Sequence, residues 1–190
     1  MAGRADLHIH TCYSDGRPTV RAVLAHAARR TALDVIAITD HDTIAGALEA
    51  RELAPAYGIA VVVGEEVTSR EGHILGLFLR ERVPPGLSAL ETVAAIHQQG
   101  GLAVAAHPFL RGHSNLAGVG RVRMGVGEAL RRVPFDGVEV AHSFPLLAWA
   151  NLRAGRFNAR YGRRAAIGNS DAHVVEAIGK GFTRFPGRTA

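Results

Sequence analysis

The sequence predicts one α/β domain, residues 1–190, in which parallel strands covered by helices close into a barrel. Apolar runs of strand length alternate with stretches of helical periodicity along all 190 residues. These runs are almost continuously apolar, as in strands that are buried on both faces. Polar residues follow the runs at their C-terminal ends, which in a closed parallel barrel converge on one rim. An open doubly wound sheet, the competing architecture, would spread them along an edge.

The first half of the chain is expected to hold four strands and three helices. Pro18 suits a first helical turn, Gly58 suits a helix end, and Ser88 with Glu91 forms a capping box. The expected strands are residues 5–10, 34–41, 59–69 and 72–79, and the expected helices are residues 18–30, 43–58 and 88–99.

The second half is expected to hold three strands and one helix. The expected strands are residues 102–108, 137–143 and 165–173, and the expected helix is residues 145–162. Residues 109–127, rich in glycine and arginine, are predicted to form a long loop whose second part could be helical. Internal repeats, low-complexity tracts and linkers are absent from the sequence, which favours a single domain.

Composition limits the partners and the kind of metal site. The formal net charge is +5, and the basic residues are 21 arginines and Lys180, which we interpret as spread along the chain rather than as one patch. Cys12 is the only cysteine, so a disulfide within the chain and a thiolate metal cluster are both excluded. A signal peptide and a run of 18 apolar residues are also absent. We therefore expect a cytoplasmic protein with no membrane contact, and no stable protein partner is predicted.

The stretch "ADLHIHTCYSDG", residues 5–16, places two imidazoles on one face of a strand. His8 and His10 are two residues apart and so point to the same side, about 6.5 Å apart along the backbone. Five further strand ends supply histidine or carboxylate side chains: Asp40 with His41, Glu65 with Glu66, His107, Glu139 with His142, and Asp171 with His173. Imidazole and carboxylate ligands suit Mn, Fe or Zn, and their number exceeds one closed tetrahedral site. The pattern predicts several divalent ions that share bridging carboxylates and leave positions open to water.

Seven motifs in this order resemble the PHP (polymerase and histidinol phosphatase) family, and most of all its TrpH-like phosphoesterases. They are "DLHIHTCYSDG", "AITDHDT", "GEEVTS", "GHILGL", "AAHP", "VEV" and "GNSDAH", and the resemblance covers residues 6 to about 183. It implies a distorted seven-stranded β/α barrel, a cluster of two or three metals and cleavage of phosphate esters. TrpH-like relatives commonly carry an inserted segment that helps to bind substrate, and this chain lacks most of it.

The resemblance also implies a ligand set. His8, His10 and Asp171 match ligands of one metal, Glu66 matches the carboxylate that bridges to a second, and His107 matches a ligand of that second metal. Asp15, His41 and His173 match the third position. His142 departs from the pattern of many relatives, and we expect it to complete the second metal's shell. Glu65 should face the opposite side of its strand, and Glu139 is interpreted as structural.

Other residues are candidates for catalysis or for holding substrate. Asp40, Asp171 and His173 are the candidates for protonating the leaving oxygen, with orientation of a neighbouring imidazole as the alternative for Asp40. Arg111, His113 and His73 are the candidate phosphate contacts. For Arg111 and His113 the alternative is a solvated arginine-rich loop. For His73 the alternative is an ordinary hydrogen-bonding role.

We predict a hydrolase in which a metal-activated water attacks a phosphate ester. The expected substrate is a nucleotide, a short nucleic acid or another phosphorylated small molecule. Histidinol phosphate is the alternative substrate, and a non-catalytic binding module is the alternative class. An amidohydrolase is disfavoured because the lysine that such enzymes place between metals has no counterpart at a strand end. The one lysine is Lys180.

Overall fold

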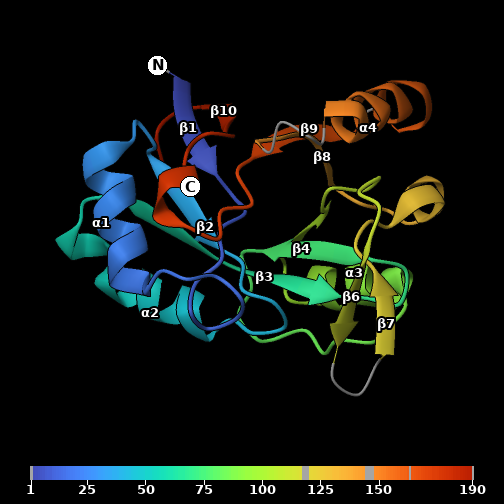
Figure 1. Ribbon diagram of the computed structural model, residues 1–190, viewed down its shortest axis with the longest axis horizontal. Coiled ribbons are helices and arrows are strands. Elements are labelled where there is room, and N and C mark those ends of the chain that lie inside the picture. Colours follow the sequence, from blue (N-terminus) through green and yellow to red (C-terminus); the bar gives the residue numbers. More distant parts are fainter. Residues whose placement is uncertain (1, 117–119, 144–147, 163, 190) are drawn as a thin grey trace.

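The computed structural model describes residues 2–116, 120–143, 148–162 and 164–189. Eight strands form one mixed sheet in the order β10-β1-β2-β3-β4-β5-β8-β9, which curls into a nearly closed barrel (Figure 1). Its strands are β1 (Ala2–Asp6), β2 (Val35–Ile38), β3 (Ala60–Thr68), β4 (His73–Leu77), β5 (Leu102–Ala105), β8 (Gly137–His142), β9 (Ala165–Asn169) and β10 (Thr183–Pro186). The predicted α/β barrel of the PHP type is therefore confirmed.

The sheet differs from the prediction in that it is not wholly parallel. The strands β1-β2-β3 and β5-β8-β9 run parallel, whereas β4 is antiparallel to both β3 and β5. The reason is the connection between β3 and β4, which consists of residues 69–72 only and is too short for the crossover that a parallel pair requires. At the other edge β10, for which no strand was predicted, pairs antiparallel with β1.

The described residues of the segment 109–127 include two paired strands where a loop was predicted. Strands β6 (His113–Leu116) and β7 (Gly120–Arg123) pair antiparallel in a separate two-stranded sheet. A 3₁₀ turn at Gly127–Arg131 follows. In Figure 1 this hairpin projects from the barrel on the side opposite α1 and α2.

Four α-helices occur in the described residues, where the periodicity predicts them: α1 (Val20–Arg30), α2 (Ala45–Leu53), α3 (Ala89–Gln98) and α4 (Ala148–Tyr161). The side chain of Thr19 caps α1, and Ser88 with Glu91 forms the predicted capping box of α3. The start of the helix predicted from residue 145 lies outside the described residues. None of the helices that the structure describes has the length and apolar character needed to cross a lipid bilayer.

Two clusters of buried apolar residues pack against the sheet. Ile36 and Ile38 of β2 belong to the cluster between sheet and helices, and Val35 and Ala37 belong to the cluster within the barrel. This alternation is the period of two expected for strands. The polar residues that follow the strands are thereby held at one end of a packed core.

Candidate metal centre

His8 and His10 lie just beyond β1, where the chain stays extended. Ile9, between them, bridges to Ala172, and its carbonyl accepts a hydrogen bond from the amide of Thr39. The two imidazoles consequently point to one side, with their Nε2 atoms 3.0 Å apart and both residues fully buried. The expectation drawn from their spacing is confirmed.

Glu66, on β3, lies among five imidazoles. Its Oε2 is 3.2 Å from Nε2 of both His8 and His10, and 3.4 Å from Nε2 of His41. Its Oε1 is 3.0 Å from Nδ1 of His73 and 3.0 Å from Nε2 of His107. Each carboxylate oxygen thus faces its own set of ring nitrogens, which is the arrangement of a bridging ligand.

Ligand atoms gather in three overlapping groups, within each of which they lie within 4.8 Å of one another. The groups are His8, His10, Glu66 and Asp171; His10, Asp15, His41 and His173; and His41, Glu66 and His73. These described residues come from opposite ends of the sequence and from both the parallel and the antiparallel parts of the sheet. The predicted gathering of the strand ends on one rim is therefore what the structure shows.

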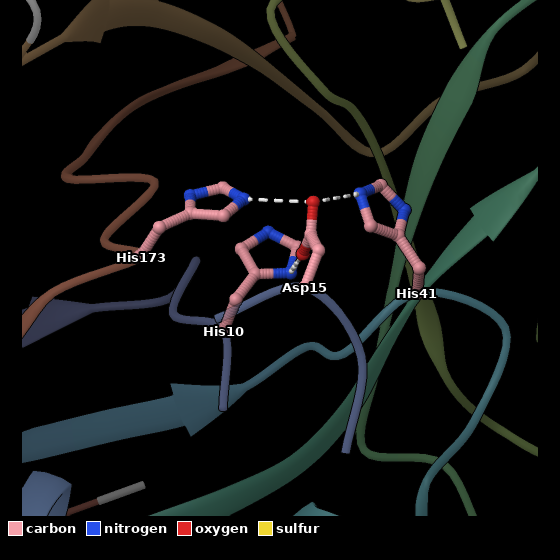
Figure 2. A group of neighbouring side chains, drawn as sticks. All are labelled: His10, Asp15, His41 and His173. Atoms are coloured by element: carbon pink, nitrogen blue, oxygen red, sulfur yellow. Dashed lines mark ion pairs between the residues drawn. The ribbon is translucent and has the colours of Figure 1, made fainter. Parts of the chain in front are cut away.

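Asp15 is the most open member of these groups. Figure 2 shows its carboxylate between the rings of His10, His41 and His173. Its oxygens lie 3.5 Å from His10 Nδ1, 3.7 Å from His41 Nε2 and 3.2 Å from His173 Nε2. Its side chain is 56% exposed, whereas those of His8 and His10 are fully buried. Solvent and substrate can therefore approach the centre from the Asp15 side.

The charges in the centre stabilise one another. Burial alone would lower the pKa of His8, but the carboxylates of Asp171, Glu66 and Glu139 raise it well above its usual value. In the same way burial is outweighed at His10, where hydrogen bonds to Asp171 and Glu66 raise the pKa to about 9. Burial would raise the pKa of Glu66, yet the surrounding imidazoles, His41 first among them, hold it well below its usual range. The carboxylates thus attract positive charge to this pocket.

The donor set fits divalent metal ions. Nε2 atoms of His8 and His10 converge on one buried carboxylate oxygen, and a buried carboxylate in proteins is either paired or bound to metal. All of the candidate ligand atoms are nitrogen or oxygen, which suits Mn, Fe or Zn.

Glu139, interpreted from sequence as structural, positions two of these histidines. Its Oε1 lies 2.9 Å from His8 Nδ1 and accepts a hydrogen bond from Asn169, and its Oε2 accepts one from the amide of His107. Metal-binding histidines commonly have such a carboxylate on the other ring nitrogen. The sequence signal was a glutamate inside an apolar strand, "VEV", since a buried carboxylate needs a partner.

Replacing Glu139 by Gln is expected to weaken metal binding by about 10–100-fold. The amide would keep the shape of the side chain, but its NH₂ group cannot accept the hydrogen bonds that both oxygens now receive. Competition with a fluorescent chelator measures the affinity, and Glu128→Gln, on the exposed turn after β7, is the matched control. Equal metal affinity in the two variants would contradict a positioning role.

Two predicted residues lie at the edge of the centre. Asp40 binds the loop before Asp15: its Oδ1 accepts from the amide of Thr11 and from Ser14 Oγ, and its Oδ2 accepts from Thr11 Oγ1. These contacts tie Asp40 to the loop that leads to Asp15, and Ser14 Oγ also lies 3.5 Å from His10 Nδ1. His142 Nε2 lies 2.9 Å from Asp171 Oδ2, and its ring centre is 6.2 Å from that of His107. His142 therefore contacts Asp171 and neighbours His107, and its place in the second metal's shell stays a prediction.

The three residues predicted to contact phosphate lie in two different places. His73 faces Glu66 inside the centre and belongs to a candidate ligand group. Arg111 and His113 are exposed and line a groove beyond His107. Glu65 faces away, as predicted, and its Oε2 accepts a hydrogen bond from the amide of Val83.

Two of the candidate ligands occupy a backbone region that disfavours side chains. The φ angle is 26° at His107 and 52° at Asp171. Non-glycine residues with positive φ are uncommon and tend to occur at functional sites, where the surrounding structure holds them in place. At His107 the hydrogen bond from its amide to Glu139 is one such restraint.

Comparison with known proteins agrees with this geometry. The model of the PHP domain matches residues 6–117, and that of the PHP-associated region matches residues 148–190. The chain belongs to the PHP domain family. It is therefore a PHP-type metal-dependent phosphoesterase, the class of hydrolase that acts on phosphoric esters.

Relatives of this PHP chain include an uncharacterized protein and two enzymes with named activities. An uncharacterized protein of Methanocaldococcus jannaschii is 38% identical over 152 residues, which are 74% of this chain and 82% of that protein. A 5'-3' exoribonuclease of Haemophilus influenzae is 37% identical over 105 residues (52% and 37% of the two chains). A 3',5'-nucleoside bisphosphate phosphatase of Chromobacterium violaceum is 37% identical over 92 residues (46% and 32%). The matches to these two enzymes thus span only about a third of their length.

The fold also matches a solved structure. A two-domain protein of Bacteroides vulgatus that contains a predicted PHP-like metal-dependent phosphoesterase superposes with a TM-score of 0.72 at 22% identity. The match covers 93% of this PHP chain and 53% of that one. This similarity supports the barrel fold.

Proposed function

We propose that this PHP chain hydrolyses phosphate esters of nucleotides or of short nucleic acids at the centre around Glu66. The observation that carries the proposal is the position of Glu66 between two sets of imidazole nitrogens, with Asp15 and its three histidines alongside. The names of two relatives, a nucleoside bisphosphate phosphatase and an exoribonuclease, support this substrate class.

The residues divide into three binding positions. His8, His10 and Asp171 with one oxygen of Glu66 would hold one ion, and His73 and His107 with the other oxygen would hold a second. Asp15, His41 and His173 would hold a third at the solvent side. Bound divalent ions of this kind lower the pKa of water and neutralise charge on phosphate oxygens.

The side chains around these positions orient the ligands and the substrate. His142 and Glu139 fix the carboxylate of Asp171 and the ring of His8. Asp40 is removed from the candidates for protonating the leaving oxygen, because Thr11 and Ser14 occupy both of its oxygens. Asp171 and His173 are assigned to the first and third binding positions, and of these His173 is the more exposed.

Metal analysis combined with a substrate panel tests the proposal. The chain, loaded separately with Mn, Fe or Zn, is expected to hold two or three ions and to hydrolyse a nucleoside 3',5'-bisphosphate or a short oligonucleotide. Histidinol phosphate and p-nitrophenyl phosphate complete the panel. Faster turnover of histidinol phosphate would favour the alternative substrate, and a metal-loaded chain inactive on the whole panel would overturn the proposal.

A further inference from the structure

Positive charge is concentrated in one part of this chain. Residues 108–164 contain ten arginines and three carboxylates (Glu128, Asp136 and Glu139), a formal charge of +7, whereas the whole chain carries +5. The other eleven arginines and Lys180 are spread over the rest of the chain, which is formally −2. Eight of these arginines are exposed: Arg111, Arg121, Arg123, Arg131, Arg132, Arg153, Arg156 and Arg160. They lie on and around the β6–β7 hairpin and α4, which Figure 1 shows on the side away from α1 and α2.

This basic part is anchored directly to the metal centre. The carbonyl of Met124, just after β7, accepts a hydrogen bond from the amide of His73 at the start of β4. The amide of Gly127 donates to the carbonyl of Pro108, the residue after His107. Helix α4 is tied to His142, because Asn151 both accepts from the amide and donates to the carbonyl of that residue. Both arginine-bearing parts are therefore hydrogen-bonded to segments that carry histidines facing Glu66 or Asp171.

A groove of about 420 Å³ lies between the hairpin and α4. It is lined by Arg111, His113, Arg123 and Arg153, among others, and we call it the arginine groove. At its end the guanidinium of Arg111 lies 5.4 Å from the ring centre of Trp149, whose side chain remains 43% exposed. Guanidinium groups contact phosphates in a bidentate manner, and an exposed aromatic ring can stack on a base.

We propose that the arginine groove binds the nucleotides next to the scissile phosphate of a single-stranded nucleic acid, with Trp149 as a stacking platform. A basic groove interleaved with aromatic rings is the combination that single strands require, because their bases are unpaired and their backbone carries a charge at each nucleotide. The inference rests on the proposed function for the position of the scissile phosphate. It makes the preferred substrate an oligonucleotide, with a mononucleotide filling only the metal centre.

Binding without turnover tests this inference. The probes are single-stranded RNA and DNA of about twelve nucleotides with phosphorothioate linkages, which resist hydrolysis, and fluorescence anisotropy with the metal-loaded full chain gives Kd. Arg111→Ala with Arg123→Ala should weaken binding and reduce the slope of log K against log salt by roughly 1.4, about 0.7 for each lost phosphate contact. Trp149→Ala should weaken binding at least about fivefold. Binding of single-stranded RNA or DNA that is tighter than binding of a duplex supports the proposal. The tighter of the two single strands identifies the preferred sugar.

The matched control removes two exposed arginines from the opposite side of the chain. Arg29→Ala with Arg30→Ala, at the end of α1, should leave Kd and the salt slope unchanged. Equal losses in the control and in the groove variant would overturn the inference, as would a duplex or a polyglutamate probe of matched charge bound as tightly as the single strand. A chain that binds the probes but hydrolyses no ester would instead overturn the proposed function and leave the groove assignment standing.

Discussion

Glu66→Gln is expected to abolish phosphoesterase activity and to reduce the number of bound ions. Each oxygen of Glu66 now faces a different set of imidazoles, so the neutral amide would remove the charge that two binding positions share. The loss should exceed the roughly 10–100-fold effect of removing an outer hydrogen-bond partner of a ligand. Metal content by mass spectrometry and kcat/KM on the best ester of the panel measure the change.

Glu65→Gln provides the matched control for this experiment. Glu65 is the preceding residue of the same strand, is equally buried, and faces the other side, where it accepts a hydrogen bond from the amide of Val83. A glutamine oxygen can accept that bond as well. The control should keep the wild-type metal content and turnover. If Glu66→Gln binds as many ions as Glu65→Gln, the bridging role of Glu66 is contradicted.

Gly125→Ala is expected to destabilise the chain strongly and to disturb the second metal position. A Cβ atom at residue 125 would clash with the carbonyl oxygen of Pro108 and lie 2.8 Å from that of His107, so the main chain itself must move. Such crowding costs about 1–3 kcal/mol or more, which corresponds to about 2–4 °C in Tm for each kcal/mol. Thermal unfolding by circular dichroism measures stability, and metal content reports the displacement of His107.

Replacing Gly155 by alanine should have the opposite effect on thermal stability. Gly155 lies inside α4, and a Cβ atom there would meet no other atom within 4 Å. Alanine in a helix interior is favoured over glycine by roughly 0.5–1 kcal/mol, so Gly155→Ala should raise Tm slightly without changing metal content. A Gly125→Ala variant as stable as Gly155→Ala would show that the contact between hairpin and His107 is not tight.

The sequence predicts the parts of this fold that depend on local pattern. Helix α3 begins at Ser88 with its capping box, and β2 alternates between the two apolar clusters, because both features follow from a few neighbouring residues. The antiparallel direction of β4 and the β6–β7 hairpin could not be predicted from the sequence. Strand direction at β4 depends on the length of one turn, and the pairing of β6 with β7 depends on glycine-rich residues without hydrophobic alternation.

The candidate site also has one part that the sequence predicts and one part that it does not. Convergence of His8, Glu66 and Asp171 could be predicted, because barrel topology brings strand ends together whatever their separation in sequence. The individual partners of each side chain could not. Whether His142 reaches Asp171 or His107, and whether Asp40 contacts His41 or Thr11, is decided by side-chain directions in loops that the spacing of residues does not specify.

The left-handed backbone at Asp171 places a conformational cost inside the candidate metal centre. Glycine adopts such a conformation freely, whereas an aspartate there costs of the order of 1–3 kcal/mol. Glycine at this position would relieve that backbone cost but would also remove the carboxylate that pairs with His8, His10 and His142, so heat resistance gains little there. Selection for heat resistance and turnover together would have to find its gains elsewhere in the molecule.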